Sequence, residues 1–158
     1  MKVENNLVDR IMDGITAALT LAAIVLVAVR WNRIPKRIPM NYSFDGQITS
    51  YGGKGSLILL LVILIAEAVG LTLVIRFPKC WNLPCTVTDN NRYIVYRTTK
   101  TWISIVRIIL LLAIFLLLVY SVCGRKLPAW YTPVELILIF GVIIAGLVVI
   151  CVRGAKYR

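Results

Sequence analysis

Two ionisable side chains lie inside apolar stretches of the sequence, where a charge is costly. Glu67 is near the middle of the apolar run from Leu57 to Ile75, and Arg107 lies near the start of a later run. An ionisable group at the centre of a bilayer costs at least about 2.5 kcal/mol unless it faces a partner or water. We therefore predict an intramembrane pair between Glu67 and Arg107. Asp13, at a similar depth in the first run, could share the arginine.

This pair has two interpretations that the sequence leaves open. A buried ion pair can serve only to orient neighbouring helices. Alternatively, Glu67 could carry protons for transport, or the group could bind lipid headgroups.

Most familiar catalytic mechanisms lack their residues here. The chain has no histidine, which excludes Ser–His and Cys–His nucleophile pairs and histidine metal sites. The string "GGKGS" lacks the spacing of a phosphate-binding loop, so we interpret it as a linker. The cysteines are too dispersed along the chain to share one ion, and we expect free thiols at Cys80, Cys85, Cys123 and Cys151. We therefore expect a non-enzymatic protein with no metal and no cofactor.

Four apolar runs explain the composition of the chain. The sequence has 158 residues, of which 59% are hydrophobic, whereas soluble domains have about 45–50%. The runs cover residues 11–29, 57–75, 102–122 and 134–152. Each is long enough to cross a hydrocarbon core of about 30 Å as a helix, and lipid-exposed backbone must be helical when apolar residues do not alternate. The sequence therefore predicts an all-α membrane protein, a single domain of four transmembrane helices.

The basic residues predict the orientation. The formal net charge is +11, but Lys and Arg lie between the apolar runs and do not gather with aromatic residues on one soluble face, so nucleic-acid binding is not expected. Of the 18 Lys and Arg residues, ten lie on the side of both termini, seven lie on the other side, and one is Arg107. By the positive-inside rule we expect both termini in the cytoplasm.

A polar insert separates the first two runs at residues 34–54. Apolar residues alternate with others from Ile38 to Phe44, and Asp45 and Gly46 follow. This pattern predicts an extracytoplasmic β-hairpin with a type I′ turn, which needs positive φ at both central residues. A lone hairpin is marginally stable in water, so we expect it to lie on the helix ends with its aromatic face buried or at the interface.

The insert also carries a family resemblance. The string "IPKRIPMNYSFDGQITSYGGK", residues 34–54, resembles the signature of a bacterial membrane domain of unknown function. The same domain is found at the start of SdpI-family toxin-immunity proteins. The resemblance implies a protein of the bacterial cytoplasmic (inner) membrane that protects it from a secreted toxin, and in some members captures a cytosolic repressor.

Departures from the signature bear on the chemistry of the insert. Asn41 and Thr49 stand where the family has His and Asp, whereas Pro39, Gly46 and Lys54 are retained. A proton-transfer or metal role that rests on the missing pair cannot operate here. The remaining residues favour a structural or recognition role, and the candidate recognition residues are Pro39, Asn41, Asp45, Gly46 and Lys54.

The inner loop, residues 76–101, is similar to a second pattern of the same family. Its candidate docking residues are Asn82, Pro84, Thr88, Asn91 and Tyr96. We expect Thr88 to cap a helix whose first turn includes Asp89. The mixture of basic and aromatic residues that follows predicts a helix lying in the inner headgroup layer. This segment could be a membrane anchor or a docking surface for a cytosolic partner.

Together these features predict an integral membrane protein of SdpI-like type, with a role in toxin immunity, signalling or accessory binding. The alternative is a small proton-coupled transporter that uses Glu67. Expected partners are membrane lipids, a peptide toxin or a cytosolic regulator, and a second copy of the chain.

Overall fold

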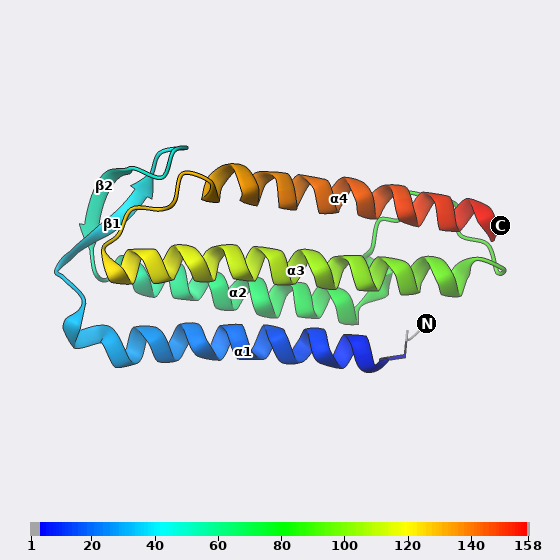
Figure 1. The fold of residues 1–158 in the computed structure, drawn as a ribbon. Helices are drawn as coiled ribbons and strands as arrows, with labels where there is room; N and C mark the ends of the chain where they lie inside the picture. Colours follow the sequence, from blue (N-terminus) through cyan, green and yellow to red (C-terminus); the bar gives the residue numbers. More distant parts are fainter. Residues whose placement is uncertain (1–3, 158) are drawn as a thin grey trace.

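The computed structural model describes residues 4–157, and this part of the chain folds into four long helices and one hairpin (Figure 1). The helices are α1 (Leu7–Arg30), α2 (Ser56–Arg76), α3 (Arg92–Cys123) and α4 (Tyr131–Lys156). Short 3₁₀ turns, η1 (Trp31–Arg33) and η2 (Pro78–Cys80), follow α1 and α2. Each helix contains the apolar run predicted for it, so the predicted four-helix fold is confirmed.

The helices run alternately in opposite directions. The start of α1 and the end of α4 lie at one end of the bundle, which we call the terminal end (Figure 1). The two strands lie at the opposite end, which we call the hairpin end. The loop between α2 and α3 therefore shares the terminal end with both chain ends.

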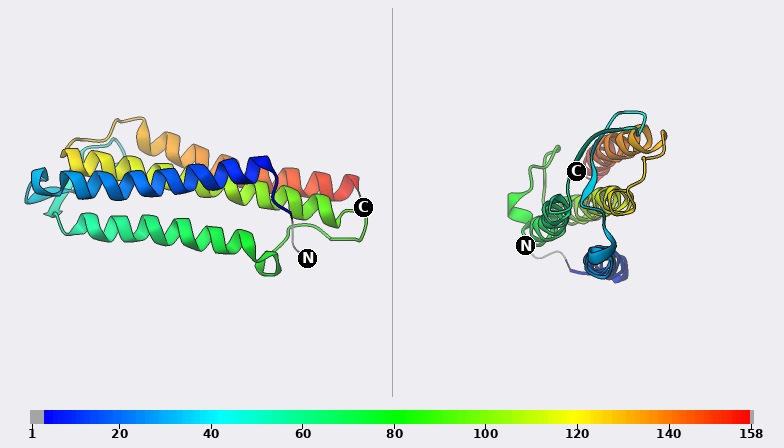
Figure 2. Two further views of the ribbon diagram at one scale, coloured as in Figure 1. Left: turned by 90° about the horizontal axis from the view of Figure 1, so that it is seen from below. Right: turned by 90° about the vertical axis from the view of Figure 1, so that its left-hand side faces the viewer.

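The third helix is the centre of the bundle. It packs against each of the other three helices and lies between them when the molecule is viewed along its long axis (Figure 2). Two hydrophobic clusters line these contacts. The cluster near the hairpin end contains Val27, Ile34, Ile38, Leu57, Leu118 and Val122, and the cluster in the middle contains Ala23, Leu64, Ala68 and Leu111. α1 and α2 touch each other much less than either touches α3.

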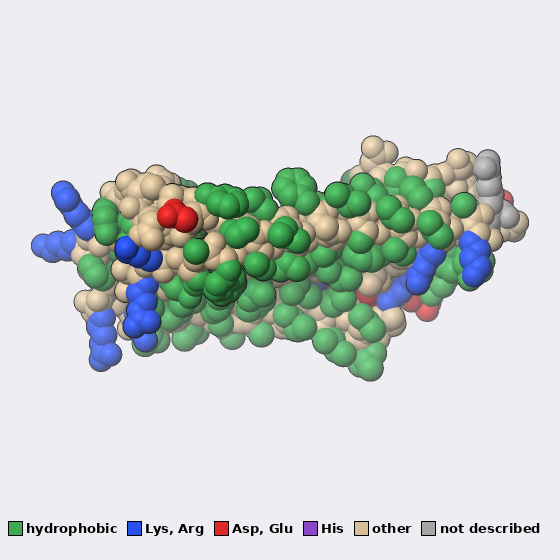
Figure 3. All heavy atoms as spheres, turned by 45° about the horizontal axis from the view of Figure 1, so that its top comes forward, with side chains coloured by type: hydrophobic (Ala, Val, Ile, Leu, Met, Phe, Trp, Pro, Cys, Tyr) green, Lys and Arg blue, Asp and Glu red, His purple; other side chains and the backbone are tan. Residues whose placement is uncertain are grey.

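Most of the apolar surface faces outward. In the apolar 18-residue stretch of each helix, only 11–28% of the residues are buried inside the protein. Figure 3 shows hydrophobic side chains along the length of the bundle, with Lys and Arg at its two ends. Soluble proteins rarely expose so large a continuous apolar surface to water. This surface therefore faces lipid, and the chain is a multi-pass integral membrane protein.

The inner loop does not form the separate interfacial helix that the sequence predicts. α3 is continuous from Arg92, since no Gly or Pro interrupts it before its left-handed cap at Gly124. Its 32 residues span about 48 Å, more than a hydrocarbon core of about 30 Å. The first turns stay upright because their polar side chains are used inside the bundle. Thr98, for example, accepts a hydrogen bond from Arg153 of α4 at 3.2 Å.

The predicted hairpin is confirmed, with β1 (Arg37–Tyr42) antiparallel to β2 (Ile48–Gly53). The regular alternation of side chains predicted for its first strand is not observed. The register shifts on both sides of Asn41, and Met40 has no opposite residue, so it forms a bulge. Burial does not alternate either, since Ile38 and Pro39 are both buried, while Met40 is 40% exposed.

The predicted type I′ turn is wrong. The turn is closed by a hydrogen bond from the Gly46 amide to the Ser43 carbonyl at 2.9 Å. Only Gly46 has positive φ in this turn, at 80°, whereas Phe44 and Asp45 do not. The loop is longer than two residues, so the glycine alone takes the left-handed position that reverses the chain.

Candidate functional site

The hairpin is fixed to the loop between α3 and α4. The carbonyl of Gly46 accepts a hydrogen bond from the Leu127 amide at 3.0 Å. The hydroxyl of Tyr42 lies 3.3 Å from Ser121 Oγ and donates to the Arg125 carbonyl at 3.4 Å. Burial raises the pKa of Tyr42, so the hydroxyl keeps the proton that it donates. These contacts hold the hairpin in one position on the bundle.

The candidate residues of the insert have different surroundings. Pro39 is buried, whereas Asn41 is exposed and donates a hydrogen bond to Ser50 Oγ at 2.8 Å. The ammonium of Lys54 lies 4.7 Å from the centre of the Trp31 ring, a cation–π contact at the base of the hairpin. The insert therefore uses Pro39 and Lys54 to attach itself to the bundle.

The hairpin carries a negative charge in its turn and exposed apolar side chains in its turn and both strands. Ser43 donates a hydrogen bond to the carboxylate of Asp45, and this bond lowers the pKa of that carboxyl. Met40, Phe44 and Tyr51 are 40%, 64% and 62% exposed. We call these three apolar side chains the hairpin surface.

Arg107 is held by Asp13 and not by Glu67. The buried guanidinium lies 2.8 Å from Asp13 Oδ1 of α1 and donates to Thr72 Oγ1 of α2 at 2.8 Å. Both carboxyl oxygens of Glu67 are buried and have no hydrogen-bond partner within residues 4–157. The predicted direct pair is not formed, because Thr72 occupies the depth of Arg107 and Glu67 lies about 7.5 Å further along α2.

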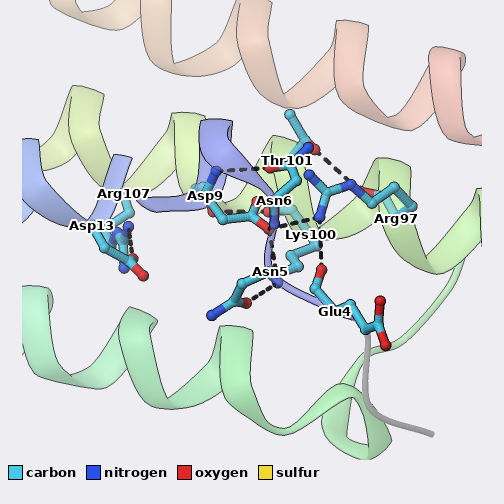
Figure 4. Close-up of polar contacts among 10 residues, drawn as sticks. Glu4, Asn5, Asn6, Asp9, Asp13, Arg97, Lys100, Thr101 and Arg107 are labelled. Carbon is cyan, nitrogen blue, oxygen red and sulfur yellow. Dashed lines mark hydrogen bonds and ion pairs between the residues drawn. The ribbon is translucent and has the colours of Figure 1, made fainter. Parts of the chain in front are cut away.

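A second polar group at the terminal end was missed in the sequence. Asp9 Oδ2 lies 2.6 Å from Arg97 Nη1 and 3.0 Å from Lys100 Nζ, which joins α1 to α3 (Figure 4). We call these three residues the terminal cluster. A signal for it was present, since Asn6 and Asp9 have the spacing of a capping box and exchange the two hydrogen bonds of that motif at the start of α1.

Within the inner loop, Asn91 is a tether inside the fold. It is fully buried and donates from Nδ2 to the carbonyls of Thr86 at 3.1 Å and Gly154 at 2.9 Å. Its Oδ1 accepts from the Thr88 amide at 2.8 Å, and its own amide donates to Thr88 Oγ1 at 3.4 Å. The predicted helix cap at Thr88 is therefore wrong: the helix begins later, at Arg92, so Asp89 lies outside its first turn, and Thr88 instead stabilises the turn before α3 through Asn91.

The other residues of the inner-loop pattern lie nearer the surface. Half-buried Tyr96 stacks on Trp81, with ring centres 5.8 Å apart, and the Trp81 indole donates to the Val74 carbonyl at 2.7 Å. Asn82 and Pro84 are exposed and line a groove of about 390 Å³ between α2, α3 and α4. The pattern therefore combines residues that fold the loop with residues that remain accessible.

The described residues thus form two separate candidate regions. At the hairpin end, a fixed hairpin presents apolar side chains that can bind a partner. At the terminal end and within the bundle, paired charges and one unpartnered carboxyl group can bind polar groups or exchange a proton.

Comparison with curated proteins gave no match, and comparison with solved structures gave none. Residues 18–66 match a family model described as a domain of unknown function (DUF1648). This region covers less than a third of the chain and includes much of α1, the whole hairpin and the first half of α2. The match supports the resemblance of this part of the chain, insert included, to a domain of unknown function.

Proposed function

We propose that this protein acts without catalysis, as an SdpI-like membrane protein that binds a secreted peptide toxin at its hairpin end. The observation that carries the proposal is the hairpin surface. Phe44 and Tyr51 are more than 60% exposed although the hairpin that bears them is bonded to the α3–α4 loop. A surface that is already ordered loses less entropy on binding than a mobile loop does.

The chemistry of this surface suits an amphipathic peptide. Lys36 and Arg37 are exposed at the start of the hairpin, and Lys126 lies near Asp45 at its tip. Apolar side chains of a membrane-active peptide would meet Phe44 and Tyr51, and its polar groups would meet these charges. Binding at this position would keep the peptide out of the bilayer.

In this proposal the protein lies in the bacterial cytoplasmic membrane with its terminal end in the cytoplasm. The excess of basic residues on that side supports this orientation. Asn82 and Pro84, exposed on the inner loop, would then be available to a cytosolic regulator.

A challenge experiment tests the immunity function. Cells with and without the gene are exposed to the peptide fraction secreted by the source strain, and survival is counted. We expect deletion to reduce survival, and the double variant Phe44→Ala with Tyr51→Ala to restore little of it. Thr49→Ala, another exposed residue of the hairpin, is the control and should protect as the wild type does. Equal survival with and without the gene would rule out immunity to that fraction.

Glu67 favours a second candidate function, a small proton-coupled transporter. Its two carboxyl oxygens are buried in the membrane-spanning part of α2 without a hydrogen-bond partner in the described chain, which is an expensive arrangement unless the group is used. Four spans barely enclose a pathway, so such a transporter would act as a homodimer.

Liposomes separate the two functions. Purified protein is reconstituted with a pH gradient, and uptake of the lipophilic cation ethidium is followed. A transporter should give uptake that depends on the gradient and is lost in Glu67→Gln but kept in the exposed Asp45→Asn control. No uptake by the wild type would remove this candidate for such cations and would leave the immunity function untouched.

A further inference from the structure

A polar chamber and a lipid-facing groove are neighbours beside α1 and share three lining residues. The chamber, about 310 Å³, lies at the terminal end between α1, α2 and α3. The groove, about 670 Å³, runs between α1 and α2 toward the middle of the bundle. Asp13, Thr72 and Arg76 line both. Both volumes are in the range of small-molecule sites, about 300–1,000 Å³.

Two buried polar groups that line this space, one acceptor and one donor, have no hydrogen-bond partner within the described residues. Asp9 lines the chamber and is 3% exposed, yet its Oδ1 accepts no hydrogen bond from the described residues. Arg107 lines the groove and is fully buried, yet its Nε donates none within residues 4–157. Buried groups in native proteins normally have partners. A ligand that offers both a hydrogen-bond donor and an anionic acceptor would complete them.

Accessible charges of both signs line the same space. The side chain of Asp13 is half exposed although it pairs with Arg107. Arg76, at the end of α2, is exposed and forms no ion pair within the described chain. Figure 4 shows the terminal cluster and the Asp13–Arg107 pair following one another along α1. This space can therefore bind both a positively charged and a negatively charged group of a ligand.

The groove itself is apolar and open to lipid. Its walls include Leu21 and Ile24 of α1 and Val69 and Leu73 of α2, all at least 38% exposed. From Asp13 to Ile24 the groove follows α1 for about 16 Å. An occupant must therefore join a doubly charged head to a long apolar chain.

We propose that this space holds one aminophospholipid, with a phosphoethanolamine head, from the leaflet at the terminal end. Its phosphate is bound by Arg76 and by Arg107 Nε, and its ammonium donates to Asp9 Oδ1 and Asp13. One acyl chain lies in the groove. Pockets with basic residues between transmembrane helices suit phospholipid heads, and the two carboxylates select an amine. The site lies at the opposite end from the hairpin surface, so it is independent of the proposed function.

Native mass spectrometry of the purified protein tests the head. The protein is given equal amounts of phosphatidylethanolamine, phosphatidylcholine and phosphatidylglycerol with identical chains. Choline has no N–H donor and glycerol has no positive charge, so phosphatidylethanolamine should be retained about tenfold over either. Equal retention of the three lipids, or preference for phosphatidylglycerol, would overturn the proposal. Glycerophosphoethanolamine, the head without chains, should not compete at equal concentration, and full competition would refute the role of the groove.

Two pairs of variants test the location. Ala17→Phe fills the groove, whereas Ala18→Phe changes an exposed neighbour on α1 that does not line it. Arg76→Gln removes a cation from the chamber, whereas Lys79→Gln removes one from η2 outside it. The first variant of each pair should lose about tenfold in phosphatidylethanolamine retention at an unchanged melting temperature. Wild-type retention in both, or equal loss in the controls, would show that the lipid does not bind here.

Discussion

Gly46 determines the position of the hairpin because its backbone contacts the α3–α4 loop. It has a φ of 80°, and a Cβ added to it would overlap the carbonyl of Leu127. Left-handed backbone costs a non-glycine residue about 1–2 kcal/mol, and the overlap adds to this cost. Gly46→Ala should therefore lower the melting temperature in detergent. Gly53→Ala is the matched control, since a Cβ there meets nothing within 4 Å. Equal melting of the two variants would mean that the hairpin is not docked.

The partner of Arg107 can be tested by single substitutions, since its buried guanidinium needs an anion inside the bundle. Removing one member of a buried pair typically costs about 3–5 kcal/mol. Asp13 is half exposed, so we expect Asp13→Asn to cost less, about 1–3 kcal/mol. Glu67→Gln removes no hydrogen bond and should change the melting temperature little. Greater destabilisation by Glu67→Gln than by Asp13→Asn would mean that Glu67 is the true partner.

Among the elements, the inner loop is joined to the end of α4 by the buried side chain of Asn91. Asn91→Ala would leave the carbonyl of Thr86 and the buried carbonyl of Gly154 without their donor, and an unmet buried group costs about 1–3 kcal/mol. We therefore expect faster tryptic cleavage at Lys79 in Asn91→Ala, measured by limited proteolysis. Asn90→Ala, an exposed neighbour, should be cleaved at the wild-type rate. Unchanged cleavage of Asn91→Ala would contradict the tether.

For the whole molecule, the native cysteines report the topology. Cys80 is exposed at the terminal end and Cys123 at the hairpin end. With single-cysteine variants and a membrane-impermeant maleimide, we expect Cys123 to react in intact cells and Cys80 only after permeabilisation. The reverse result would invert the orientation, and labelling of both from one side would contradict an odd number of crossings between them.

The rate at which Cys85 reacts with the maleimide gives a further prediction for the same experiment. Cys85 is partly buried, and burial raises the pKa of its thiol. Because the thiolate is the reactive form, Cys85 should label more slowly than Cys80 at neutral pH after permeabilisation. Raising the pH should increase its rate.

The sequence by itself determined the spans, the presence of the hairpin and the concentration of charge at the ends. These depend on composition over short windows, since a run of about 20 apolar residues has few alternatives to a membrane helix. It also contained the capping box of Asn6 and Asp9, which is a local motif. The retained Pro39 and Gly46 indicated a shaped insert, and both are buried where the hairpin meets the bundle.

Only the tertiary structure decided which groups meet. The choice of Asp13 over Glu67 as partner of Arg107 depends on the relative depth and rotation of three helices, and the burial of Asn91 depends on where α4 ends. The bulge at Met40 depends on the register of the two strands. Such contacts join residues far apart in the chain, and their geometry is set by packing rather than by the local preferences that a sequence pattern records.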